Sequence, residues 1–169
     1  MKAPVVISAC LAGLKTRYDG TARTHPLLKQ IMEQAIPVPV CPEILGGLGI
    51  PRSPSRFIGG DGAAVLQTKA TIVDETGADR TSFFVRGAEQ TLQLVKLISP
   101  VLIIFKEGSP SCGLRRVDIE GSWRNGCGVA TAMLRSLGFP ILSEEDSLSD
   151  FLTRLSGKMV HKADQPGEF

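Results

Sequence analysis

Short apolar runs along this chain alternate with stretches in which apolar residues recur at helical spacing. The most apolar run extends from Pro100 to Phe105 and is bounded by turn signals. Such a run, rich in β-branched residues, predicts a strand that is buried on both faces of a sheet. Shorter runs from Val5 to Ala9, from Pro37 to Val40 and from Phe139 to Ser143 predict three further strands.

Helical periodicity fills much of the chain between these strands. Apolar spacing predicts helices over His25 to Ala35, Thr81 to Ile98, Gly126 to Leu137 and Ser147 to Ser156. The segment from Ala64 to Val73 predicts extended structure or a hairpin. The segments from Cys41 to Gly62, rich in glycine and proline, and from Leu114 to Asn125 predict loops.

Because strands alternate with helices, we expect an α/β fold of Rossmann-like character, a single domain whose mostly parallel sheet carries helices on both faces. A chain of 169 residues is long enough for one such domain with its own core. The domain is expected to span residues 1–157, and residues 158–169 are expected to form a C-terminal tail. The pattern leaves the strand order and the oligomeric state open.

Composition and charge limit the partners and the cellular compartment that we expect for this domain. The net charge of +2 gives no support for a large RNA-binding surface, and no apolar run approaches the roughly 20 residues that span a bilayer. Met1 leads almost directly into the first strand, so we expect no secretory signal and a cytoplasmic protein. In a reducing compartment, four cysteines indicate metal binding or catalysis rather than disulfides.

Three of the cysteines, Cys10, Cys41 and Cys112, come after predicted strands. Because ligands bind at the carboxyl edge of open α/β sheets, we expect these thiols to converge there. The alternative is that they are small buried core residues. Zinc sites usually contain close pairs such as C-x₂-C, which are absent here. Iron–sulfur clusters accept widely separated thiolates, and three of them on a four-iron cluster would leave one iron open.

Other candidate residues lie close to these thiols in the sequence. Glu43 could act as a general base or could be an exposed loop carboxylate. Ser109 could donate to a ligand or form a turn, and Lys106 could contact a ligand or be a solvated residue at the strand end. Two arginines in the long loop, Arg52 and Arg56, could contact an anion. The fourth cysteine, Cys127, is expected to be a small packing residue at the start of a helix; the alternative is a thiol whose pKa the helix start lowers.

Several ordered motifs together resemble the thiouracil desulfidase family, long catalogued as domain of unknown function 523. The resemblance covers the chain from about Val5 to Ser143. It is carried by Ser8-Ala9-Cys10-Leu11, Arg17-Tyr18-Asp19-Gly20, Cys41-Pro42-Glu43, Gly46-Gly47-Leu48, Pro51-Arg52, Gly60-Asp61-Gly62, Lys106, Ser109-Pro110-Ser111-Cys112-Gly113 and Gly128-Val129-Ala130-Thr131-Ala132.

The resemblance implies an enzyme that removes sulfur from a thiolated pyrimidine such as 2-thiouracil, giving uracil and hydrogen sulfide. It also implies a [4Fe-4S] cluster held by Cys10, Cys41 and Cys112, with a small thiolated base or nucleoside as substrate. Glu43 would then activate water, and Ser109 or Lys106 would stabilise developing negative charge. The competing hypothesis is a non-catalytic metal- or nucleotide-binding domain, such as a sensor.

Two positions depart from the pattern that the resemblance implies. Thr16 stands where the family usually has a further cysteine, just before the Arg-Tyr-Asp-Gly motif. Ser55-Arg56-Phe57 stands where an acidic residue usually follows the Pro-Arg motif. The second departure bears on the choice of substrate.

Overall fold

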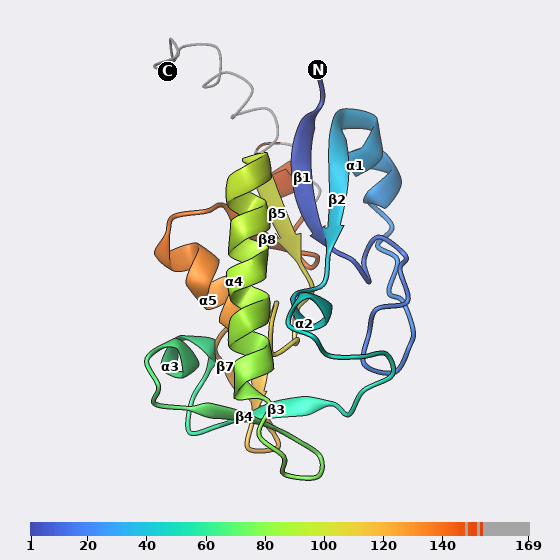
Figure 1. Ribbon diagram of the computed structural model, residues 1–169. Coiled ribbons are helices and arrows are strands. Elements are labelled where there is room, and N and C mark those ends of the chain that lie inside the picture. The colour runs from blue at the N-terminus through green and yellow to red at the C-terminus, as the bar shows by residue number, and fades with distance from the viewer. Residues whose placement is uncertain (148, 152, 154–169) are drawn as a thin grey trace.

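The three strands that precede Cys10, Cys41 and Cys112 are neighbours in one parallel sheet. The computed structural model describes residues 1–147, 149–151 and 153. Its first sheet has the order β2-β1-β5-β8 and is parallel throughout. All three thiol-bearing loops therefore leave the same edge of the sheet (Figure 1). The strands are β1 (Ala3–Ser8), β2 (Ala35–Val40), β5 (Leu102–Phe105) and β8 (Ile141–Ser143).

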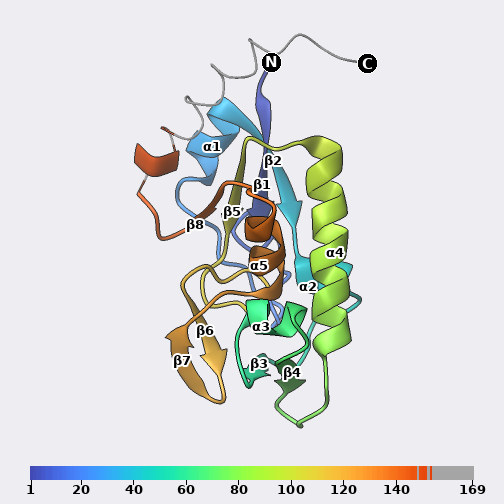
Figure 2. The same cartoon turned by 90° about the vertical axis from the view of Figure 1, so that its left-hand side faces the viewer.

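Helices cover both faces of this sheet, as the alternation of strands and helices predicts (Figure 2). Val6 of β1 belongs to a core that is shared with α4 and α5. Its neighbours Val5 and Ile7 point the other way, into a second core shared with α1. The α/β prediction is therefore confirmed. The helices are α1 (Leu28–Gln34), α4 (Thr81–Ile98) and α5 (Val129–Ser136).

The short helix α2 (Pro42–Leu45), which directly follows Cys41, packs against α4 through two glycines. A Cβ atom on Gly46 would lie 2.0 Å from the carbonyl oxygen of Phe83, and one on Gly87 would lie 2.0 Å from that of Pro42. Because neither backbone leaves room for a side chain, only glycine permits this approach. The contact fixes the start of the loop after β2 against the longest helix.

A second sheet, with the order β4-β3-β6-β7, is present in addition to the one sheet that the sequence predicts. The pair β3–β6 is parallel, whereas β3–β4 and β6–β7 are antiparallel. In Figure 1 this sheet lies below the carboxyl edge of the first. Its strands are β3 (Ser55–Ile58), β4 (Thr71–Asp74), β6 (Arg116–Ile119) and β7 (Ser122–Asn125).

Three segment predictions need correction. Residues 41–62 are not one loop, because they contain α2 and β3. Residues 64–73 contain the end of α3 (Gly62–Leu66) and most of β4, and β4 pairs with β3 rather than within the segment. Residues 114–125, predicted as irregular, form the β6–β7 hairpin. These elements have only four or five residues each, too few for a period to emerge.

The limits of the helices also differ from the prediction in places. Helix α1 ends at Gln34, before the proline that was expected to end it, because β2 begins at Ala35. Helix α5 begins at Val129, since its N-cap Gly128 is extended, with φ −71° and ψ 164°. Helix α4 has its predicted limits. The tail 158–169 and five of the ten residues of the helix predicted from Ser147 to Ser156 lie outside the described residues, so the domain limit at 157 remains a prediction.

No helix in the part of the chain that the structure describes is both long and apolar enough to cross a membrane.

Candidate functional site

A cavity of about 800 Å³ lies where the carboxyl edge of the parallel sheet faces the second sheet. Its wall comes from the loops after β1, β2 and β5 and from β3 and the β6–β7 hairpin. All six residues predicted to form the site line this one cavity: Cys10, Cys41, Glu43, Lys106, Ser109 and Cys112. Convergence at the sheet edge, as expected from strand-end placement, is what the structure shows.

The three thiols of the cavity share an environment that favours their neutral form. Burial raises the pKa of Cys10 to about 11, with a further contribution from the neighbouring Cys41. Burial also raises the pKa of Cys41. The pKa of Cys112 is well above its ordinary value, first because of burial and also because of its proximity to Cys41 and Cys10. Thiolates here would repel one another unless a positive group lay between them.

This set of donors suits an iron–sulfur cluster better than a single ion. Among the described residues, no three histidine, cysteine, aspartate or glutamate side chains form a group that could hold one metal ion. In a cluster, each thiolate binds its own iron, so the three sulfur atoms need not meet at one point. Three thiols around one cavity therefore fit the cofactor that the sequence suggests.

Glu43 is neither exposed nor free. Its Oε2 atom accepts a hydrogen bond from Nε of Arg52 at 2.7 Å, and its Oε1 accepts one from Oγ of Ser109 at 3.3 Å. The Glu43 and Arg52 side chains are only 13% and 9% exposed. With both oxygens engaged, the carboxylate is held in one orientation at the cavity wall.

Arg52 is therefore occupied, although the sequence suggested it as an anion contact. Besides Glu43, its guanidinium donates to the carbonyl oxygens of Thr16 at 3.1 Å and Gly49 at 3.1 Å. The Thr16 carbonyl also lies 3.9 Å from Sγ of Cys41. Thr16, at the position where the family usually has a cysteine, lines the cavity, whereas Arg56 is not among the residues that line it.

Ser109 joins the two loops that carry Cys41 and Cys112. Its Oγ accepts hydrogen bonds from the backbone N–H groups of Ser111 at 3.1 Å and Cys112 at 3.2 Å. The same hydroxyl donates to Glu43. The turn role that the sequence suggests for Ser109 is therefore observed, together with a contact to Glu43, and donation to a ligand remains a prediction.

Lys106 is paired rather than solvated. Its Nζ lies 2.5 Å from Oε1 of Glu144 and 3.0 Å from the carbonyl oxygen of Glu107. The other oxygen of Glu144 accepts the N–H of Glu107 at 2.7 Å. The ring of His25 contacts the Glu144 carbonyl at 2.8 Å. Lys106 thus brings a compensated charge to the cavity and links the loop after β5 to the end of β8.

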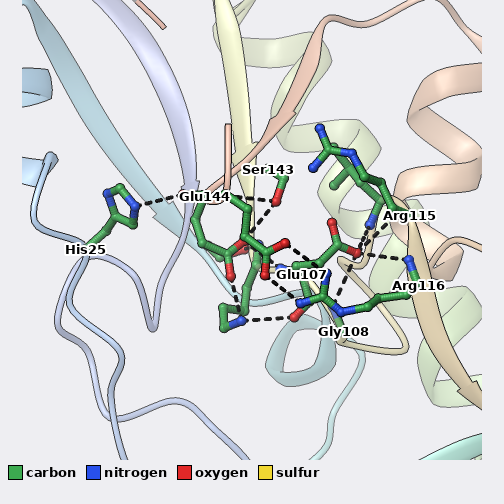
Figure 3. Close-up of polar contacts among 11 residues, drawn as sticks. His25, Glu107, Gly108, Arg115, Arg116, Ser143 and Glu144 are labelled. Atoms are coloured by element: carbon green, nitrogen blue, oxygen red, sulfur yellow. Dashed lines mark hydrogen bonds and ion pairs between the residues drawn. The ribbon is translucent and has the colours of Figure 1, made fainter. Parts of the chain in front are cut away.

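Sequence reasoning missed Glu107, which organises the loop that carries Cys112. Its Oε1 accepts the N–H groups of Leu114, Arg115 and Arg116 at 2.9, 2.9 and 3.1 Å (Figure 3). Burial pushes the pKa of Glu107 upward, but these donors outweigh burial and hold it below its usual value. The available signal was an acidic residue two positions after the end of a buried strand, where an unpaired carboxylate would be costly.

Cys127 lies apart from the cavity lining. Its N–H donates to Oδ2 of Asp61 at 2.9 Å, and its Sγ lies 3.5 Å from the same oxygen. Burial and then the Asp61 charge raise the pKa of this thiol to about 11. Asp61 also caps α3 by accepting from Ala63 and Ala64. Cys127 thus takes part in local packing and capping between α3 and α5.

Comparison with known proteins agrees with this geometry. The family model described as 2-thiouracil desulfurase matches residues 5–146. The uncharacterized protein YbbK of Bacillus subtilis (strain 168) is 36% identical over 151 residues, which cover 88% of this chain and 99% of that protein. A solved structure described as the [4Fe-4S]-dependent thiouracil desulfidase TudS (DUF523Vcz) is 36% identical, with a TM-score of 0.77, and the match covers 92% of this chain and 99% of that one. The sequence motifs, the cavity and these matches together show that the chain belongs to the 2-thiouracil desulfurase family.

Proposed function

We propose that this protein is an iron–sulfur-dependent desulfidase that converts a thiolated pyrimidine such as 2-thiouracil into uracil and hydrogen sulfide. The observation that carries the proposal is the convergence of three thiols and an oriented carboxylate on one cavity. The similar structure is described as [4Fe-4S]-dependent, and we assign the same cofactor to this chain. A small thiolated base or nucleoside fits a cavity of about 800 Å³.

Cys10, Cys41 and Cys112 would hold the cluster. When bound, the cluster would supply Lewis-acidic iron, with one iron free of protein thiolates. The net reaction replaces sulfur by the oxygen of one water molecule. The carbon–sulfur bond breaks, a carbon–oxygen bond forms, and the two protons of water leave with the sulfur, so no electron donor is required.

Glu43 would accept the proton from the attacking water. Its orientation by Arg52 and Ser109 supports this role, because a general base must be held within reach of the proton that it removes. Ser109 contacts Glu43 directly and could donate to negative charge that develops on the substrate. Lys106 would contribute positive potential at the cavity wall, moderated by its pairing with Glu144.

Two cysteine variants test the assignment of the ligands. In anaerobically reconstituted protein, Cys112→Ser is expected to lose bound iron and turnover of 2-thiouracil. Cys127→Ser, the matched control outside the cavity lining, is expected to retain both. Equal losses from the two variants would contradict the three-ligand assignment. A colourless, zinc-containing parent protein without turnover would favour the non-catalytic binding domain instead.

A further inference from the structure

The wall of the cavity contributed by the β6–β7 hairpin holds two side chains that the proposed reaction does not use. Asp118 of β6 and Trp123 of β7 are direct cross-strand partners, so their side chains lie on the same face of the hairpin. Both line the cavity that the three cysteines line. They come from the second sheet, whereas the thiols come from loops of the first.

One oxygen of the Asp118 carboxylate lacks a hydrogen-bond donor. Its Oδ1 atom is buried and has no hydrogen-bond partner among the described residues. Arg116, two residues away on the same face of β6, is engaged by both oxygens of Glu145 at 2.8 and 2.5 Å. A buried acceptor without a donor is costly, so its presence in a cavity wall points to a donor that arrives with a ligand.

The other two carboxylates that line the cavity already accept hydrogen bonds from the protein. Glu43 accepts with both oxygens, from Arg52 and Ser109. Glu107 also has one unpartnered oxygen, Oε2, but its Oε1 is committed to backbone N–H groups of its own loop. Asp118 is therefore the lining carboxylate best suited to accept a hydrogen bond from a ligand.

Trp123 supplies a flat surface beside this acceptor. The chain has a single tryptophan, and it is 66% exposed. Its indole lies over Gly108, where a Cβ would come within 3.3 Å of the ring. Gly108 precedes Ser109 in the loop that carries Cys112, so the indole covers the loop at the cavity. Exposed aromatic faces of this kind stack on nucleobases.

We propose that Asp118 and Trp123 determine the specificity of the site: Trp123 stacks on the pyrimidine ring, and Asp118 accepts a hydrogen bond from a ring N–H adjacent to the thiocarbonyl carbon. The ligand class is thus a planar thiolated heterocycle that keeps this N–H. The inference rests on the proposed function for the identity of the ligand, but it concerns binding and not bond cleavage.

The test measures binding of 2-thiouracil and of its N1-methyl and N3-methyl derivatives to the anaerobically reconstituted protein, by calorimetry and from KM and kcat. Asp118→Ala is expected to weaken binding of 2-thiouracil by roughly 10- to 100-fold, the usual effect of a hydrogen bond to a charged group. One of the two methyl derivatives should bind the parent poorly by a similar factor. That penalty should largely vanish in Asp118→Ala, because the acceptor is gone.

Matched variants separate recognition from folding. Trp123→Leu is expected to weaken binding by roughly tenfold or more through lost stacking. Arg124→Ala, an exposed position of the same hairpin that does not line the cavity, should bind as the parent does. Asp118→Ala should melt at or above the temperature of the parent, because it removes an unpartnered buried acceptor.

The inference is overturned if Asp118→Ala binds 2-thiouracil like the parent, if it retains the full N-methyl penalty, or if the parent does not bind the base. Binding that depends on Asp118 without any release of sulfide would support the recognition and refute the proposed reaction.

Discussion

In the proposed reaction, Glu43 is the residue that removes a proton from the attacking water. Arg52 and Ser109 hold its two oxygens, and its side chain is 13% exposed at the cavity wall. Glutamine has the same shape and retains one acceptor oxygen, but it cannot remove a proton. The substitution therefore isolates the base from the rest of the site.

Glu43→Gln is expected to keep its cluster and to turn over 2-thiouracil about 10² to 10⁴ times more slowly, the range for a positioned general base. Substrate binding should change little, so the effect should appear in kcat rather than in KM. Sulfide release and iron content are measured on the same anaerobic sample. A variant that keeps both its iron and the parental rate would show that Glu43 is not the base.

Glu107 stabilises the loop that carries Cys112 by accepting its backbone N–H groups, so the contribution of Glu107 to stability depends on pH. Its pKa is lowered in the folded protein, where burial opposes ionisation but the N–H donors of the loop outweigh it. A carboxylate with a lowered folded-state pKa stabilises the protein above its unfolded pKa of about 4.3, and this stabilisation is lost as the pH falls through the folded-state value.

Glu107→Gln is accordingly expected to lower the free energy of unfolding at pH 7 by roughly 1–3 kcal/mol, because a charged acceptor is removed from a buried set of donors. The difference between variant and parent should shrink as the pH falls below about 4. Denaturant titrations at pH 7 and pH 3 measure it. An unfolding difference that stays the same at both values would show that the charge of Glu107 is not what stabilises the loop.

At the scale of elements, the contact between α2 and α4 links the cavity to the core. Alanine would improve the intrinsic helix propensity of position 87 by about 1 kcal/mol. A Cβ there would nevertheless lie 2.0 Å from the carbonyl oxygen of Pro42, a backbone atom that has no alternative rotamer. The steric cost should therefore outweigh the propensity gain.

Gly87→Ala is expected to destabilise the protein by roughly 1–3 kcal/mol net, as overpacking does, and to reduce bound iron because α2 carries the residue after Cys41. Gly49→Ala is the control, since a Cβ there meets nothing within 4 Å. It should lie within about 0.5 kcal/mol of the parent. Thermal melts and iron content check both variants. If Gly87→Ala proved as stable and as rich in iron as Gly49→Ala, the contact would not position the site.

The elements also show what can be read from a single sequence. The strand β5 was predictable because it lies in an unbroken apolar run, and α4 was predictable because its helical period repeats over 18 residues. The β6–β7 hairpin was not, since its four-residue strands are joined by Glu120-Gly121, with φ of 56° and 81°. That pair lacks the Asn-Gly or Asp-Gly signature of such turns. The residues on the hairpin face, Asp118 and Trp123, were missed for the same reason.

The residues of the site were predictable from the sequence, but their hydrogen-bond and ion-pair partners were not. Placement after strands was enough to bring Cys10, Cys41 and Cys112 to one cavity. The pairing of Glu43 with Arg52 depends on how residues 41–52 fold back, which no local pattern encodes. The partner of Lys106 is Glu144, which comes from the far end of the chain.

At the scale of the whole molecule, the cavity lies between the carboxyl edge of the parallel sheet and the second sheet. Loops at the carboxyl edge of the parallel sheet carry the thiols and Glu43, and the β6–β7 hairpin of the second sheet contributes to the opposite wall. Under the proposed function, this division would assign the chemistry to loops of one sheet and the recognition of the ring to the other. It also requires that the whole described fold, rather than any isolated loop, be intact for activity.

The most direct test of this account is the amount of uracil and sulfide formed from 2-thiouracil by the anaerobically reconstituted protein, with no electron donor added. We predict one uracil and one sulfide for each 2-thiouracil consumed, over many turnovers and with constant iron content. A protein that holds its full complement of iron and acid-labile sulfide, yet leaves 2-thiouracil unchanged, would contradict the account.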